Sequence, residues 1–185
     1  MSWNDFHHRE DILRAVVDTA DENRDGVLPM HVAGVTQNFT DELDLVGALL
    51  LKWHARLSGN IERATAREPM DLASAVASGW RTTAEQMPGV RLVIDRCIEQ
   101  PAGPEMERAM RRARQREWAR LAAAAGLANG ESDAAVAAGR RVEERARAGY
   151  AEPAPVNRPV VADAADRVVE QPASLANRIK ALLAA

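Results

Sequence analysis

The stretch from residue 21 to residue 28, DENRDGVL, carries oxygen-bearing side chains at the spacing of a calcium-binding loop. Asp21, Asn23 and Asp25 match the first three ligand positions of an EF-hand, and Gly26 matches its turning glycine. The last ligand position, which needs a two-oxygen carboxylate, is Val32, and no second loop of this kind follows. Asn, Asp and Gly also favour a tight turn without metal. We therefore expect a turn without a metal ion, with calcium binding as the alternative.

The residue types that carry catalysis lack the spacing that catalysis needs. The four histidines show no HExxH-like pattern of metal ligands, and the single cysteine, Cys97, has no evident histidine partner. The sequence contains no glycine-rich phosphate loop and no serine nucleophile elbow. One cysteine also suits a reducing compartment. We expect a cytoplasmic protein that is not an enzyme and holds no cofactor.

Three tryptophans fall on apolar faces of separate expected helices. Trp53, Trp80 and Trp118, together with Met87, are candidates to line a pocket for a small apolar ligand. Cys97 would lie near them. Plain core packing uses the same residue types, so both interpretations stay open.

The composition predicts an all-α fold. Hydrophobic residues make up 46% of the chain but aromatic residues only 4%, so small aliphatic side chains must fill the core. Such side chains suit close helix–helix packing. No apolar stretch approaches the ~18 residues of a membrane-spanning helix, so we expect no membrane contact.

Helical periodicity locates the elements that must position these side chains. The clearest is the segment 41–66, with apolar residues such as Leu45, Leu49 and Trp53 on one face. Thr40 is its predicted N-cap, and Asp41 and Glu42 suit the positive end of the helix dipole. We expect further helices over residues 5–21, 71–86, 88–98, 104–125 and 131–148, with one or two helical turns in PMHVAGV.

The charges are unevenly distributed. Residues 1–70 carry 12 Asp and Glu against 7 Lys and Arg, whereas residues 71–185 carry 15 against 17. The N-terminal part should therefore repel phosphate on average. Residues 108–120 include arginines at every fourth position, which could grip an acidic partner. The favoured interpretation is a solvated face, balanced in part by Glu105, Glu107 and Glu117.

The segment REDILRAVVDTADENRDGVLPMHVAGVTQNFTDELDLVGALL resembles the N-terminal region of the TetR family of bacterial transcriptional regulators. The matching features are an Ile-Leu-x-Ala element, a Gly-containing turn, a Val-Ala step, a Gly-Val-Thr turn, a Phe and a Leu-rich helix. The residues that match are Arg9, Ile12, Leu13, Ala15, Gly26, Val32, Ala33, Gly34, Val35, Thr36, Phe39, Leu45, Val46 and Ala48. The resemblance implies a helical homodimer that regulates transcription and responds to a ligand or a partner.

Two departures from the family pattern bear on DNA binding. Only Gln37 and Asn38 lie between the Gly-Val-Thr turn and Phe39, which is too short for a helix that enters a major groove. Glu42 stands where the family has a Lys that contacts phosphate. Sequence-specific DNA binding is therefore doubtful. Thr36, Gln37 and Asn38 are the expected contacts if it occurs.

These observations divide the chain into four parts. We expect a TetR-like region with an eroded helix-turn-helix over residues 1–62 and a helical regulatory and dimerisation domain over 63–150. A Pro-rich flexible linker over 151–172 then leads to a short amphipathic helix over 173–185, with an apolar face. The alternative to a TetR-like regulator is a helical adaptor that docks on a protein partner through this last helix. The apolar face consists of Leu175, Ile179, Leu182 and Leu183.

Overall fold

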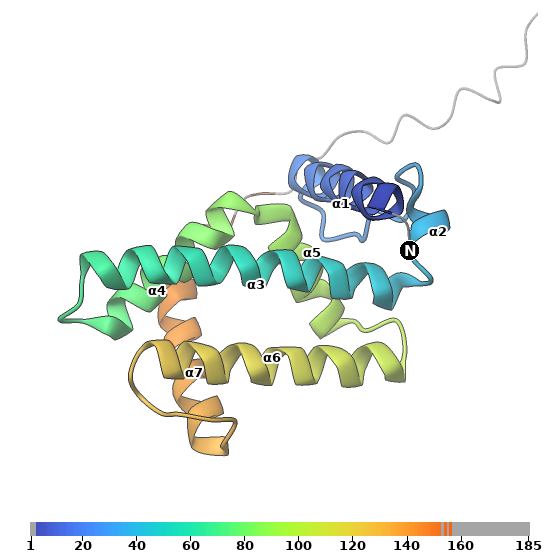
Figure 1. Ribbon diagram of the computed structural model, residues 1–185. Helices are drawn as coiled ribbons and strands as arrows, with labels where there is room; N and C mark the ends of the chain where they lie inside the picture. Colours follow the sequence, from blue (N-terminus) through green and yellow to red (C-terminus); the bar gives the residue numbers. More distant parts are fainter. Residues whose placement is uncertain (1–2, 153, 155, 157–185) are drawn as a thin grey trace, which may run out of the picture.

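The computed structural model describes residues 3–152, 154 and 156. The secondary structure of this part of the chain consists of helices joined by turns and loops, without strands (Figure 1). The all-α prediction is confirmed. No helix within the described ranges has the length and apolar character to cross a membrane. The expected linker and terminal helix from residue 157 onward lie outside the described residues. The helices within the described residues are α1 (Trp3–Asn23), α2 (Val35–Asn38), α3 (Glu42–Arg67), α4 (Leu72–Gln86), α5 (Pro88–Glu99), α6 (Pro104–Ala124) and α7 (Asp133–Ala148).

Three of the helices begin at a residue whose side chain caps them, and one predicted cap is wrong. The N-cap of α3 is Asp41, whose carboxylate accepts from the Asp44 amide at 2.8 Å. The predicted cap, Thr40, lies one residue outside, and its own amide donates to the Asp44 carboxylate at 3.0 Å. A carboxylate is the stronger acceptor at the positive end of a helix, which explains the preference. Asp71 and Ser132 cap α4 and α7 in the same way.

The segment PMHVAGV is not helical, contrary to expectation. Its backbone bonds join residues two or three positions apart, as in the bond from the Met30 amide to the Leu28 carbonyl, so no helical turn forms. Gly34 then adopts a φ of 89°, a left-handed conformation that favours glycine. α2 then forms a single turn that begins at Val35.

The long helix α3 runs through the middle of the molecule, with α1 and α6 on different sides of it (Figure 1). It packs on α4, α6 packs on α7, and α1 packs mainly on α5. One buried apolar cluster includes residues from Ile12 in α1 to Ala146 in α7, with Trp53 and Trp80 fully buried. The expected domain boundary at residue 62 falls inside α3.

Two glycines allow the closest helix crossings. A Cβ on Gly139 in α7 would collide with the backbone of Trp118 in α6, and one on Gly89 in α5 would collide with the carbonyl of Ala20 in α1. Such contacts bring the helix backbones together, and they bring the polar side chains of α5, α6 and α7 into reach of one another.

Candidate functional site

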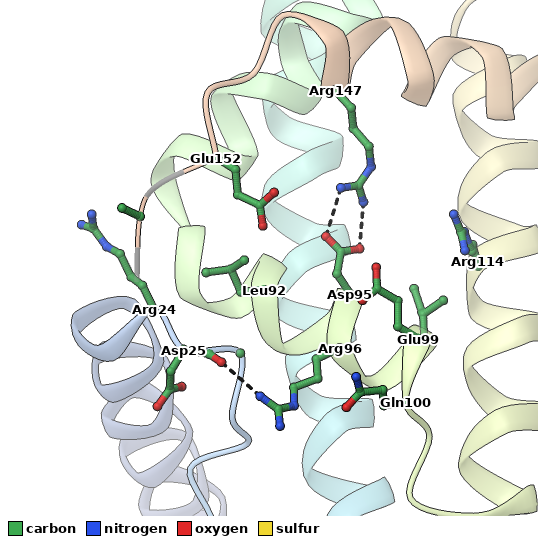
Figure 2. A pocket seen from close by; sticks show the side chains of 13 residues that line it. Arg24, Asp25, Leu92, Asp95, Arg96, Glu99, Gln100, Arg114, Arg147 and Glu152 are labelled. Atoms are coloured by element: carbon green, nitrogen blue, oxygen red, sulfur yellow. Dashed lines mark hydrogen bonds and ion pairs between the residues drawn. The ribbon is translucent and has the colours of Figure 1, made fainter. Parts of the chain in front are cut away.

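A polar cleft of about 780 Å³ opens between α5, the turn after α1, α6 and the segment that follows α7 (Figure 2). Leu92 and Ile98 of α5 provide the main apolar part of its lining. Side chains of both charges make up most of the rest, and they come from these four segments and from α7 itself. The basic residues are Arg24, Arg96, Arg114 and Arg147, and the acidic residues are Asp25, Asp95, Glu99 and Glu152.

The turn DENRDG forms one edge of this cleft because Asp21 fastens it to α5. The Asp21 carboxylate accepts from the amide of Gly89 at 2.7 Å and lies 3.3 Å from that of Val90, so it caps α5. Pro88 opens the same helix and has no amide that needs a partner. Arg24 and Gly26 both have positive φ, which turns the chain back across α5.

This use of Asp21 bears on the calcium question. Its carboxylate points at the start of α5, and that of Asp25 accepts from the Val27 amide at 2.8 Å within the turn itself. No group of three or more His, Cys, Asp or Glu side chains within the described ranges is arranged to hold a metal ion. Burial raises the pKa of Asp21, and the two amide hydrogen bonds only partly oppose this.

Three arginines of the cleft form no ion pair with another described residue. Arg24 donates to the carbonyl of Asp21 at 3.0 Å, Arg96 lies 3.4 Å from the carbonyl of Asp25, and Arg114 lies 4.6 Å from the ring centre of Trp118. Asp25, Glu99 and Glu152 likewise form no ion pair within the described part of the chain. The cleft thus presents guanidinium and carboxylate groups whose charges no ion pair among the described residues neutralises.

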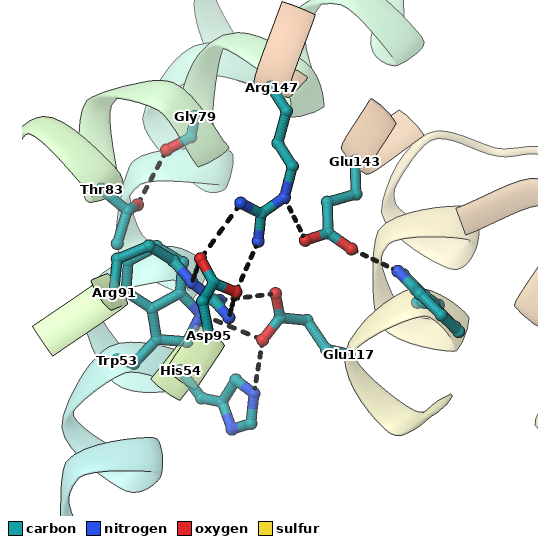
Figure 3. Close-up of polar contacts among 10 residues, drawn as sticks. Trp53, His54, Gly79, Thr83, Arg91, Asp95, Glu117, Glu143 and Arg147 are labelled. Carbon is teal, nitrogen blue, oxygen red and sulfur yellow. Dashed lines mark hydrogen bonds and ion pairs between the residues drawn. The ribbon is translucent and has the colours of Figure 1, made fainter. Parts of the chain in front are cut away.

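The fourth arginine of the cleft belongs to a buried polar network (Figure 3). Arg147 grips the Asp95 carboxylate with both terminal nitrogens, at 2.8 and 3.1 Å, and donates to Glu143 at 2.8 Å. Arg91 approaches the same Asp95 carboxylate at 2.6 and 3.1 Å. Glu143 also accepts from the indole N–H of Trp118. These bonds join α5, α6 and α7.

Glu117 extends the network to α3. It is buried, and its Oε2 accepts from the indole of Trp53 and lies 3.0 Å from His54 Nε2. Its other oxygen lies 3.6 Å from Arg91. Arg91 is itself buried, and its Nη1 has no hydrogen-bond partner within the described residues. We call the set Arg91, Asp95, Glu117, Glu143, Arg147 and His54 the buried network.

The network favours the charged form of two of its carboxylates, Asp95 and Glu117. Burial alone would raise the pKa of Asp95, but the charge of Arg91 and the bonds from Arg147 outweigh it and lower the pKa. Burial would likewise raise the pKa of Glu117, whereas the bond from His54 and the charge of Arg91 lower it. Two guanidinium groups therefore face three carboxylates, with His54 beside them.

The predicted ligand-pocket residues lie mostly in the core. Trp53 and Trp80 pack edge to face with ring centres 5.8 Å apart, and Met87 is buried. Trp118 is half-buried against Arg114 and Glu143. None of the four lines the polar cleft, so an apolar pocket at these residues stays a prediction.

The predicted DNA contacts sit on α2. Thr36 and Gln37 are exposed, whereas the side chain of Asn38 donates back to the carbonyl of Gly34 at 2.9 Å. Arg9 donates to the backbone carbonyl of Asn38 and binds Asp44, which fastens α2 to α1 and α3. α2 spans four residues, about one turn.

The sequence did not single out the buried network. Glu117 was expected to balance arginines on a solvated face, but it is buried and faces Arg91 instead. The arginines of that face, at 108, 112, 116 and 120, are exposed. A signal was present: Arg91 and Asp95, like Glu143 and Arg147, are opposite charges four residues apart, and Arg91 interrupts an apolar run.

In comparisons with known proteins, no family model, no curated protein and no solved structure matches the chain.

Proposed function

We propose that this is a non-enzymatic, TetR-like helical regulatory protein whose polar cleft binds a small zwitterionic molecule, such as an amino acid or a short peptide. One observation supports this most. Asp95 and Arg147 line the cleft and are also members of the buried network that joins α3, α5, α6 and α7. A molecule in the cleft therefore has direct access to the contacts that fix the helix packing.

The charges of the cleft suit a ligand with both an anionic and a cationic group. Arg24, Arg96 and Arg114 offer planar guanidinium groups, which bind carboxylates through paired hydrogen bonds. Asp25, Glu99 and Glu152 offer acceptors for an ammonium group. The expected ligand was apolar, and the polar lining of this cleft favours a charged one instead.

Regulation requires that the ligand bind one arrangement of the protein better than another. Asp95 accepts from both Arg91 and Arg147, so a ligand carboxylate that draws Arg147 into the cleft would weaken the hold of α5 on α7. The segment after α7 lines the same cleft through Glu152 and Ala154, so it would move with α7. The output of such a regulator is then the position of α7 and of the chain that follows it.

The experiment is a thermal-unfolding screen with a defined panel: glycine, glutamate, arginine, succinate, putrescine and the dipeptide Gly-Gly. A ligand at roughly a hundred times its Kd adds about 2.7 kcal/mol to the free energy of unfolding. For a chain of this size that is a rise in Tm of roughly 5–10 °C. We expect zwitterions to raise Tm more than succinate or putrescine, which carry one kind of charge.

The matched variants are Arg114→Ala, which removes a cleft guanidinium, and Arg112→Ala, which removes an exposed one from the same helix. We expect only Arg114→Ala to abolish the rise in Tm. The proposal is wrong if no member of the panel raises Tm, or if both variants respond like the unaltered protein. Hydrogen exchange of α7 with and without the active compound then tests the coupling, which requires slower or faster exchange in that helix.

A further inference from the structure

An apolar groove lies between α1 and α3, away from the polar cleft. Its volume is about 460 Å³, and its apolar lining is Leu13, Gly47, Ala48, Leu51 and Ala55. Leu51 is 72% exposed, the second most exposed of the large hydrophobic side chains in the described part of the chain. A Cβ placed on Gly47 would meet no atom within 4 Å. Small residues around a protruding leucine leave room for the backbone of another helix to approach.

Two ion pairs border this groove and join the two helices. Arg9 of α1 binds Asp44 of α3 at 2.7 Å, and Lys52 of α3 binds Glu10 of α1. Each of the four side chains is about one third exposed. An apolar strip between charged edges is the form of surface that accepts an amphipathic helix.

The sequence contains a segment of the matching kind. Residues 174–185, SLANRIKALLAA, place Leu175, Ile179, Leu182 and Leu183 on one helical face. Residues 171–185 contain Arg178 and Lys180 and no acidic residue. Residues 1–70, which form both walls of the groove, have five more acidic than basic side chains. The charges of the segment and of this half of the protein are therefore complementary.

The chain can reach the groove from its last described position. The Val156 amide donates to the carbonyl of Asn23 at 3.3 Å, at the end of α1. Leu13 lies ten residues back along α1, about 15 Å away. The 17 residues 157–173 separate Val156 from the segment. Seventeen residues behaving as a flexible linker span roughly 20–25 Å on average. A linker of this reach holds the segment at an effective concentration on the order of millimolar.

We propose that residues 174–185 dock as an amphipathic helix in the apolar groove between α1 and α3 of the same chain. Leu182 and Leu183 pack beside Leu51. The groove and the ligand cleft share no lining residue, so this proposal can be tested independently of the proposed function.

The test uses the full chain with a spin label and nuclear magnetic resonance. The variant Cys97→Ser with Asn177→Cys carries one label on the polar side of the segment. We expect the amide signals of Gly47, Ala48 and Leu51 to broaden. Those of Met70 and Leu127, which are exposed apolar residues at other places on the surface, should stay sharp.

Two further variants make the outcome decisive. Leu182→Asp should restore the groove signals, whereas Ala184→Asp, the same charge on the opposite face, should leave them broadened. Leu51→Asp changes an exposed residue, so the fold should survive while docking is lost. Unchanged signals in the labelled protein, or broadening that persists with Leu182→Asp, would overturn the proposal. A mixture of two proteins tests for a second copy: one is 15N-enriched and has no spin label, and the other carries the spin label without 15N. Broadening of the groove signals in this mixture would also overturn the proposal, because the occupant would then be a second copy of the chain.

Discussion

Two sets of ion pairs flank α3, and they differ in how deeply their carboxylates are buried. The buried network has members with several partners each: Asp95 binds two arginines, and Glu117 contacts Arg91, His54 and Trp53. The pairs beside the apolar groove, Arg9–Asp44 and Lys52–Glu10, are partly exposed. Burial makes the contacts of Arg91, Glu117 and Glu143 costly to break, whereas water can replace the contacts of the groove pairs. The first set joins α3, α5, α6 and α7 in the interior, and the second joins α1 to α3 at the surface.

The sharpest test of the effect of burial is to remove one carboxylate from the network and one from an exposed ion pair. Glu117→Ala leaves Arg91 buried beside an unpaired indole and His54. We expect the free energy of unfolding to fall by about 3–5 kcal/mol. Glu144→Ala removes an exposed carboxylate from α7 that pairs with Arg140 at 2.9 Å, and should cost under about 1 kcal/mol. Guanidinium denaturation measures both. Equal effects would contradict the contrast.

A second test exchanges glycines near each region. Gly139→Ala sets a Cβ against the backbone of Trp118 and should destabilise by about 1–3 kcal/mol through overpacking. Gly47→Ala fills open space within a helix and should stabilise by about 0.5–1 kcal/mol. The opposite signs, read from the same denaturation curves, distinguish a rigid crossing from an open groove. A loss of stability with Gly47→Ala would contradict this prediction and would mean that the docked segment lies directly against the backbone at Gly47.

Low pH should affect the stability contributed by the network and by the turn after α1 in opposite directions. The pKa values of Asp95 and Glu117 are lowered in the folded protein, so their contribution to stability is present above about pH 4, the ordinary carboxyl value, and is lost as pH falls through the folded values. Asp21 has a raised pKa, so it has the opposite sign and partly offsets this loss. Thermal unfolding against pH should give a shallower acid decline with Glu117→Gln and a steeper one with Asp21→Asn.

The smallest expected effect is at the border of the groove. Lys52→Ala breaks the pair with Glu10, whose side chains are each 36% exposed, and should change the free energy of unfolding by under about 1 kcal/mol. Added salt should reduce even that difference, because it screens exposed charges. If Lys52→Ala lowered the free energy of unfolding by several kcal/mol, this exposed pair would contribute as much as the network, and the distinction between the two regions would be wrong.

Local signals in the sequence predicted much of the fold. Periodicity located the six long helices within a few residues, and Asp71, Pro88 and Gly149 marked ends that the structure confirms. The prediction of a helical turn after Pro29 was wrong, because backbone hydrogen bonds between residues two or three positions apart form there instead. The polar cleft and the buried network went unpredicted for another reason. Asp21 meets Gly89, and Arg147 meets Asp95, across 68 and 52 residues, and no local pattern encodes such pairings.

The stack of aromatic rings beside the network has an optical consequence. Trp80 lies edge to face with Trp53 on one side and with Tyr150 on the other, at 5.8 and 5.9 Å between ring centres, and the Arg147 guanidinium lies 4.9 Å from its ring. Rings this close couple electronically, and the coupling depends on their mutual angle. Tyr150 lies two residues after the end of α7. The near-ultraviolet circular dichroism of the unlabelled protein should therefore change when the end of α7 moves away from Trp80.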